Sequence, residues 1–194
     1  MSDDPNANDP GAKAALRLAS ALKRDAAHAA GAAQAAARVA RHGLGVLGER
    51  SFRTVSGYWP MRSELDIRPL LELLAEAGRD VALPAVLGPG QPLEFRRWRP
   101  GEALVAGRFG TAHPAPEAKR LEPDVLLVPL LAFDAAHHRL GYGAGFYDRT
   151  LAALRRHKPV LAIGVAYAAQ RVEAVPRDAW DEPLDLVLTE EGIL

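Results

Sequence analysis

The stretch from Arg139 to Arg149 combines residue types that could bind an anion. Its glycines stand at alternate positions, Gly141, Gly143 and Gly145, between an arginine at each end. Glycines of this kind let backbone N–H groups approach a phosphate closely, and the N-terminus of a following helix adds a favourable dipole. Arginines supply fixed charge and bidentate geometry for the same anion. The glycine spacing alone also fits a flexible turn, and the Lys-Ser/Thr of a Walker A loop is absent after the last glycine.

Other charged residues could complete such a site. Asp148 follows the glycines, and a carboxylate there can hold the Mg²⁺ that accompanies a nucleotide. Lys13 and Arg17 lie four residues apart, hence on one face of a helix, although a solvated basic pair is the plain alternative. The histidines offer no helical zinc spacing, because His137 and His138 are adjacent, and we place both in an exposed turn.

Apolar runs predict the elements that must position these residues. Helices are expected from Gly11 to about His42 with a break at Gly31, at Asp66–Ala77, and at Thr150–His157. Strands are expected at Arg53–Trp59, Val81–Leu83, Leu93–Trp98 (an edge strand), Val125–Val128 within the apolar run Val125–Phe133, Val160–Val165 and Leu186–Leu188. Strands separated by helices predict an α/β fold, a Rossmann-like, three-layer and mainly parallel sheet flanked by helices. Ligands of such sheets bind beyond the carboxyl ends of the strands, where we expect the glycine stretch.

Composition fits an ordinary globular protein, with 194 residues, 48% of them hydrophobic and 25% charged. We expect a single domain over 11–194 after a polar, disordered tail over 1–10 that has no signal-peptide core. The net charge is zero, with 24 basic and 24 acidic residues, which argues against a nucleic-acid partner. There is no cysteine and no apolar run of about 20 residues that would span a membrane. A cytoplasmic protein is expected.

The whole string Arg139–Arg149, with the apolar run Val125–Phe133 ahead of it, is far more specific than its glycines. It resembles the signature of the 5-formyltetrahydrofolate cyclo-ligase family, Arg-Leu-Gly-(Tyr/Arg)-Gly-x-Gly-(Phe/Tyr)-Tyr-Asp, which follows an apolar strand ending in Pro-x-x-x-Phe. The resemblance extends from Lys13 nearly to Leu194. It implies an enzyme that uses ATP and Mg²⁺ to convert 5-formyltetrahydrofolate to 5,10-methenyltetrahydrofolate, releasing ADP and phosphate.

The resemblance also implies roles for individual residues. ATP would contact Lys13, Arg17, Arg139, Leu140, Gly141, Tyr142, Gly143, Ala144, Gly145, Phe146 and Tyr147. The folate would contact Trp59, Glu64, Tyr142, Gly143, Ala144, Gly145 and Phe146. Arg149 and Tyr147 would be catalytic, and Asp148 and Asp181 would hold Mg²⁺. The chemistry of Glu64 suits this role, because a carboxylate can accept two parallel hydrogen bonds from the 2-amino group and ring N–H of a pterin. Without the resemblance, Glu64 would suit the start of a helix and Asp181 a loop cap.

One position departs from the family pattern. Many members have a Gly-Ile-x-Glu-Pro-like string after the edge strand, and His113 stands here in place of the glutamate. Nearby, Arg96, Arg97 and Arg99 surround Trp98, and we interpret them as solvated charges on the edge strand, with the polyglutamate tail of a folate as a second interpretation.

Two alternatives to the cyclo-ligase stay open. One is a non-catalytic homologue that binds folate or nucleotide, and the loss of the glutamate at position 113 is compatible with it. The other is a different phosphate-substrate enzyme on a similar scaffold, such as a sugar-phosphate isomerase or a CoA transferase. In each case the expected partners are small molecules, and the expected state is a monomer.

Overall fold

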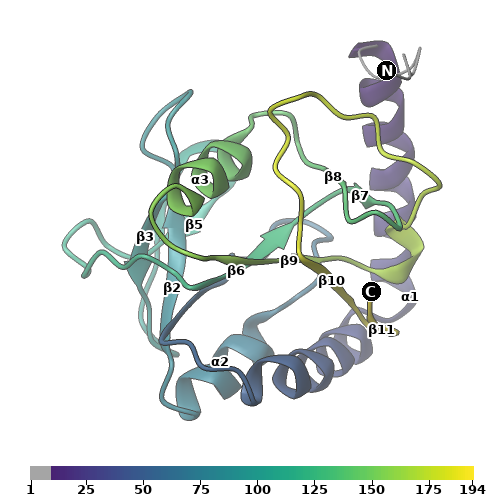
Figure 1. The fold of residues 1–194 in the computed structure, drawn as a ribbon. Coiled ribbons are helices and arrows are strands. Elements are labelled where there is room, and N and C mark those ends of the chain that lie inside the picture. The colour runs from purple at the N-terminus through teal and green to yellow at the C-terminus, as the bar shows by residue number, and fades with distance from the viewer. Residues whose placement is uncertain (1–9) are drawn as a thin grey trace.

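The computed structural model describes residues 10–194. The expected tail over 1–10 therefore lies outside the described residues, except for Pro10, with which the first helix begins. A seven-stranded sheet forms the centre of the molecule (Figure 1), in the order β11 (Gly192–Ile193), β10 (Leu186–Thr189), β9 (Leu161–Val165), β6 (Val125–Pro129), β1 (Thr54–Ser56), β2 (Asp80–Ala85) and β3 (Glu94–Arg97). The five inner strands are parallel, and β3 and β11 run antiparallel at the two edges. The predicted fold class is confirmed.

Helices cover both faces of this sheet (Figure 1). On one face lie α1 (Pro10–Gly48) and α2 (Arg68–Glu76), packed on Val125 and Leu127 of β6. On the other face lies α3 (Phe146–Arg155), packed on Leu126 and Val128 of the same strand. A strand buried on both faces needs an unbroken apolar run, which is why the sequence predicted β6. The predicted break at Gly31 is confirmed as a kink in α1, with φ 171° and ψ 52°.

Short elements between the main ones differ from the expectations. The apolar run Val125–Phe133 is not one strand, because β6 ends at Pro129 and a small hairpin follows, β7 (Ala132–Phe133) and β8 (Arg139–Leu140). The connection after β3 contains a second hairpin, β4 (Val105–Ala106) and β5 (Ala112–His113), around the 3₁₀ turn η1 (Arg108–Gly110). A further 3₁₀ turn, η2 (Ala168–Gln170), follows β9. The third helix starts at Phe146, four residues before the predicted Thr150.

Side chains near these hairpins correct two further expectations. His137 and His138 are half-buried, because Asp134 at the hairpin turn accepts hydrogen bonds from the backbone and ring of His138 at 3.0 and 3.1 Å. The edge strand β3 is confirmed, but Arg96 on it is buried, with 7% exposure, and forms an ion pair with Glu94 at 2.8 Å. Of the three arginines, Arg99 is exposed as expected.

The strand order creates the crevice in which a ligand can lie. From β1 the chain passes through α2 to β2 on one side, and from β6 it passes through α3 to β9 on the other. Since β1 and β6 are neighbours, their connections leave the sheet in opposite directions and open a space beyond their carboxyl ends. None of the helices in residues 10–194 combines the length and apolar character needed to cross a bilayer.

The close packing over β9 generates a test of the fold. A Cβ at Gly164 would lie 2.5 Å from Leu184 Cδ1 and 2.7 Å from Leu130 Cδ2, whereas a Cβ at Gly45 would meet nothing within 4 Å. We expect Gly164→Ala to destabilise the fold by about 1–3 kcal/mol, because one extra methyl overpacks this layer. Gly45→Ala, in α1, should be neutral or stabilising by up to about 1 kcal/mol. Urea titration of both variants checks this, and equal midpoints would contradict it.

Candidate functional site

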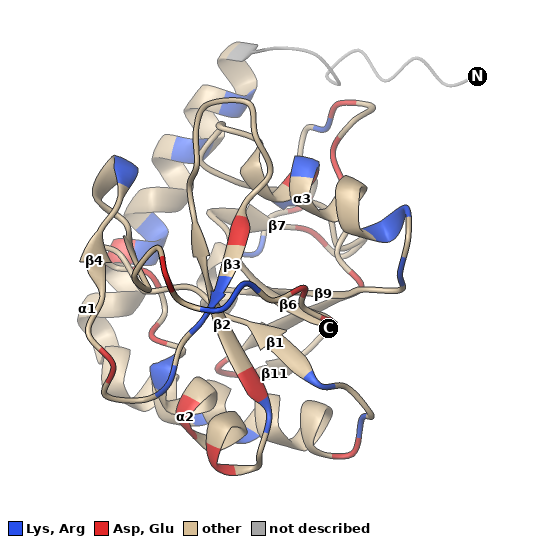
Figure 2. Cartoon of the chain, turned by 90° about the vertical axis from the view of Figure 1, so that its left-hand side faces the viewer, with Lys and Arg blue, Asp and Glu red and all other residues tan. Residues whose placement is uncertain are grey.

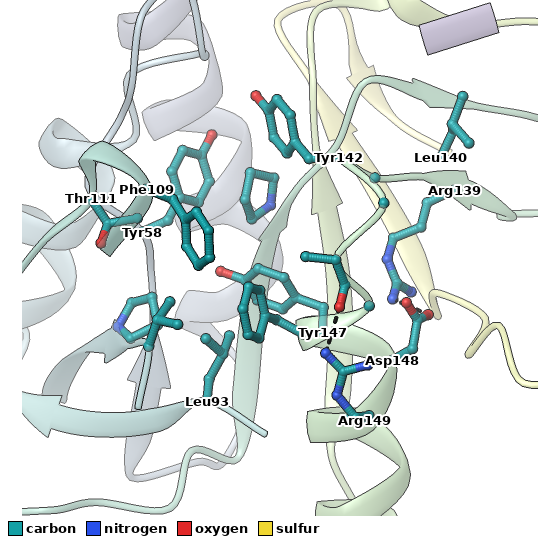
Figure 3. Close-up of a pocket in the computed structure, with 18 of the residues that line it drawn as sticks. Tyr58, Leu93, Phe109, Thr111, Arg139, Leu140, Tyr142, Tyr147, Asp148 and Arg149 are labelled. Carbon is teal, nitrogen blue, oxygen red and sulfur yellow. Dashed lines mark hydrogen bonds and ion pairs between the residues drawn. The ribbon is translucent and has the colours of Figure 1, made fainter. Parts of the chain in front are cut away.

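A cavity of about 870 Å³ lies beyond the carboxyl ends of the parallel strands. Every site residue implied by the sequence lines it: Lys13, Arg17, Trp59, Glu64, Arg139, Leu140, Gly141, Tyr142, Gly143, Ala144, Gly145, Phe146, Tyr147, Asp148, Arg149 and Asp181. Aromatic rings from four separate segments meet around it, among them Tyr58, Phe109, Tyr142 and Tyr147 (Figure 3). Residues from both ends of the chain thus contribute to one space.

The glycine loop, residues 141–145, forms one wall of the cavity and leads directly into α3. Gly143 has φ +97° and Gly145 has φ +65°, a left-handed conformation that side chains disfavour. Gly145 occupies the N-cap position of α3, so the first N–H groups of that helix adjoin the loop. This end of the helix carries a partial positive charge suited to an anion.

Two arginines lie against this loop. Arg17 of α1 donates from Nε to the Gly141 carbonyl oxygen at 3.0 Å, and a Cβ at Gly143 would lie 3.3 Å from its guanidinium. Arg149 of α3 donates from Nη2 to the Ala144 carbonyl oxygen at 2.5 Å (Figure 3). The Nε of Arg149 is buried and has no hydrogen-bond partner within residues 10–194. A buried unpaired donor is costly, and a ligand acceptor would satisfy it.

The acidic candidates are each held by a basic residue. Asp148 forms an ion pair with Arg139 at 2.5 Å. Lys13 forms ion pairs with Asp178 at 2.7 Å and with Asp181 at 3.1 Å. Burial acts to lower the pKa of Lys13, but hydrogen bonds and charge interactions with the two aspartates outweigh it and raise that pKa.

A backbone hydrogen bond connects the segment that carries Asp181 to Asp148. The N–H of Glu182, which follows Asp181, donates to Asp148 Oδ1 at 3.1 Å. The segment around Asp181 is therefore fixed to the start of α3. Mg²⁺ in nucleotide sites uses one or two carboxylates together with phosphate oxygens and water. Asp148 and Asp181 both line the cavity, so carboxylates of the kind that Mg²⁺ uses in such sites are present in it.

Glu64 also lines the cavity and is buried, with 5% exposure. Its Oε1 accepts the Tyr142 hydroxyl at 2.6 Å, and its Oε2 accepts the Met61 N–H at 2.9 Å. Burial raises the pKa of Glu64, and the hydrogen bonds from Tyr142 and Met61 offset part of this rise. Trp59 flanks the segment, edge to face with Trp98 at 5.9 Å between ring centroids.

Tyr147 and Tyr58 are aromatic hydroxyls near Glu64. Burial, and then the negative charge of Glu64, raise the pKa of Tyr147 well above its usual range. The Tyr147 hydroxyl is therefore protonated at neutral pH and can donate a hydrogen bond. Tyr58 is buried in the core and donates to the Leu65 carbonyl oxygen at 2.8 Å, as expected for a residue that fills core space.

Some residues of the cavity region had not been singled out from the sequence. Arg24 is buried and contacts the Tyr142 hydroxyl, and Asp178 binds Lys13. Arg24 follows Arg17 by seven residues, so helical spacing would have placed it on the same face of α1. Asp178 lies in a Pro- and Asp-rich connection without periodicity, and its sequence carries no such signal.

His113, the residue that departs from the family pattern, is not among the residues that line the cavity. His113 Nδ1 lies 2.8 Å from the Pro114 carbonyl oxygen and 3.3 Å from Arg96 Nη1. Its neighbours Thr111 and Ala112 do line the cavity. The buried Arg96 has Glu94 as its charged partner, so the missing carboxylate leaves no unpaired cation at this point.

The fold and cavity define a doubly wound α/β protein whose site lies at the switch point of its parallel sheet. The pattern of the 5-formyltetrahydrofolate cyclo-ligase family matches residues 10–190, and the chain belongs to this family. It is 40% identical to the 5-formyltetrahydrofolate cyclo-ligase of Escherichia coli K12 over 142 residues, 70% of this chain and 77% of that protein. The Haemophilus influenzae cyclo-ligase is 34% identical over 157 residues, 78% and 83% of the two chains. The solved 5,10-methenyltetrahydrofolate synthetase of Aquifex aeolicus superposes with a TM-score of 0.76 at 31% identity, covering 93% and 91%.

The loop geometry generates a prediction about Gly143. Gly143→Ala adds a methyl at a left-handed φ and against the Arg17 guanidinium, so we expect loss of turnover by about tenfold or more together with about 1–3 kcal/mol of strain. Gly78→Ala is the matched control, because Gly78 has φ +80° and open space and lies beyond the end of α2, away from the cavity. Thermal melting and methenyl formation should separate the two variants. Equal activity losses would show that backbone strain alone, wherever it lies, accounts for the effect.

Proposed function

We propose that the chain catalyses the ATP-dependent conversion of 5-formyltetrahydrofolate to 5,10-methenyltetrahydrofolate, with release of ADP and phosphate. The observation that carries this proposal is a single cavity with two chemically different walls. One wall is the glycine loop with Arg17 and Arg149 against it, which suits a phosphate chain. The other wall carries the buried carboxylate of Glu64 among aromatic rings, which suits a pterin with adjacent N–H donors.

The proposed reaction has two steps within this cavity. The N5-formyl oxygen attacks the γ-phosphorus of ATP, and ADP leaves. N10 then attacks the activated formyl carbon and releases its proton, and phosphate departs with the former formyl oxygen. Neither step needs a covalent bond to the protein, which agrees with the absence of cysteine.

The side chains supply position and charge. Lys13, Arg17 and Arg149 would neutralise the charge that spreads over the transferred phosphoryl group, with the loop N–H groups as further donors. The protonated Tyr147 hydroxyl would donate a hydrogen bond near the reacting formyl group. Glu64 would hold the pterin so that the formyl oxygen faces the γ-phosphate, because orientation of the two reactants accounts for much of the rate in such transfers.

Asp148 and Asp181 are the residues proposed to hold Mg²⁺. When bound, the ion would neutralise phosphate charge. Arg139 and Lys13, which pair with these carboxylates, would hold them in place. The cytoplasmic location and the monomeric state expected from the sequence stay predictions.

The first test is turnover. Mixing the protein with 5-formyltetrahydrofolate, ATP and Mg²⁺ should produce the absorbance of the methenyl chromophore, and omission of ATP or excess chelator should abolish it. Calorimetric binding of both ligands without any chromophore would instead support the non-catalytic alternative. Full-rate product formation in excess chelator would remove the proposed role of Asp148 and Asp181.

A pair of variants should separate the two walls of the cavity. Glu64→Gln keeps the size of the side chain but cannot accept two N–H groups, so 5-formyltetrahydrofolate should bind more weakly while ATP binding is unchanged. Lys13→Met should do the reverse, weakening ATP by about 1.5–3 kcal/mol through loss of a charge-assisted contact. Isothermal titration of each ligand against each variant measures this. A loss of both ligands with a lowered melting temperature would indicate a folding defect, whereas unchanged folate binding by Glu64→Gln or unchanged ATP binding by Lys13→Met would contradict the assignment.

A further inference from the structure

A chain of hydrogen bonds connects α1 to Glu64 through the glycine loop. The Arg24 guanidinium is buried, with 3% exposure, and its Nη1 donates to the Tyr142 hydroxyl. The Tyr142 hydroxyl in turn contacts Glu64 Oε1 at 2.6 Å. Arg24 Nε donates to Ser63 Oγ at 3.0 Å, which fixes the guanidinium beside the segment that carries Glu64.

The direction of this chain is determined by the groups in it. A guanidinium has donors and no acceptor, so the Tyr142 hydroxyl must accept from Arg24. Its single proton is then free to be donated, and it points to Glu64, which must accept. A carboxylate accepts with both oxygens, whereas a protonated carboxyl loses one acceptor site to its own proton. The arrangement therefore favours Glu64 in the ionised form, and cooperative polarisation along the chain strengthens this preference.

Among the charged groups around Glu64, Arg24 is the buried one that favours the ionised form. From α1 come Arg24 and Asp25, and the carboxylate of Asp25 is occupied by the Ser63 hydroxyl. From its own segment comes Arg62, which is exposed and screened by solvent. The remaining titratable groups that face Glu64 are tyrosines of high pKa, Tyr58, Tyr142 and Tyr147.

We propose that Arg24 is a positioning residue for substrate binding: acting through the Tyr142 hydroxyl, it holds Glu64 as an oriented, ionised acceptor for the N–H groups of the pterin. The proposal rests on the proposed function, specifically on Glu64 as the folate contact. Arg24 is not among the residues that line the cavity, so it would act on a ligand there through its neighbours. Within residues 10–194 each Glu64 oxygen has one hydrogen-bond partner, and the remaining lone pairs can serve the ligand.

The test is the pH dependence of 5-formyltetrahydrofolate binding in the absence of ATP, measured by calorimetry from about pH 5 to about pH 8. Arg24→Met removes the charge and keeps the length of the side chain. Burial already raises the pKa of Glu64, and loss of Arg24 should raise it further, so binding should weaken as pH falls and recover as pH rises. We expect the midpoint of this loss to move upward by about one pH unit, which is about a tenfold weaker affinity below the midpoint. Arg24→Lys, which keeps the charge, should keep the wild-type profile.

Controls separate this proposal from the assignment on which it rests. Glu64→Gln should bind weakly and without pH dependence, and wild-type binding by Glu64→Gln would show that the folate assignment itself is wrong. If Glu64→Gln behaves as expected, a pH-independent loss in Arg24→Met, or no loss, overturns the role of Arg24. Should Arg24→Met lose its cooperative melt, Arg24→Gln decides the question, because glutamine keeps an N–H donor at this position and removes the charge. An upward shift of the midpoint in Arg24→Gln supports the proposal, and an unchanged midpoint overturns it.

Discussion

The rest of the structure depends on one constraint: the chain connections that follow the neighbouring strands β1 and β6 leave the sheet in opposite directions. The chain leaves β1 toward β2 and leaves β6 toward β9, so the two crossovers separate and leave a space at the carboxyl ends of these strands. Segments remote in sequence then converge on this space: the first half of α1, the residues after β1, the glycine loop after β6 and the connection before β10. Basic residues recur along α1 and on β3 (Figure 2), and those on the inner face of α1 reach the loop. A helix outside the sheet order thus supplies charge to a site that the sheet creates.

The charged groups of the cavity are arranged before any ligand arrives. Lys13 is held by Asp178 and Asp181, Arg139 by Asp148, and Arg17 by the Gly141 carbonyl oxygen. Fixed partners lower the entropic cost of ordering long side chains when a polyanion binds. The same pairing places carboxylates beside the cations, so a triphosphate meets fewer uncompensated positive charges than the basic residues alone would offer. A divalent cation between carboxylates and phosphates would reverse that balance, which is the physical reason to expect Mg²⁺ at Asp148 and Asp181.

The sequence was most informative where a residue has few physical alternatives. A doubly buried strand requires a continuous apolar run, which identified β6, and the alternate glycines predicted a loop at 141–145, where Gly143 and Gly145 have a left-handed φ. Single-residue interpretations failed where a distant partner decides the outcome. Arg96 was interpreted as solvated, but Glu94 and the Pro114 carbonyl oxygen allow it to be buried. The contacts of Arg24 and Asp178 could not be predicted from the sequence alone. Arg24 contacts Tyr142, 118 residues away, and Asp178 contacts Lys13, 165 residues away.

Burial of Glu64 carries a cost in stability. Burial raises its pKa above the ordinary value of 4.5, so its ionised form costs folding free energy. For a carboxyl with a raised folded pKa, the stability it contributes is full below about pH 4.5 and is lost as pH rises through the folded value. At neutral pH the fold therefore holds a charge that a glutamine of the same size would avoid. Tyr142, Met61 and Arg24 reduce this cost without removing it. A buried carboxylate kept charged in this way, with lone pairs directed into a cavity, is the feature expected of a residue retained for what it binds and not for what it stabilises.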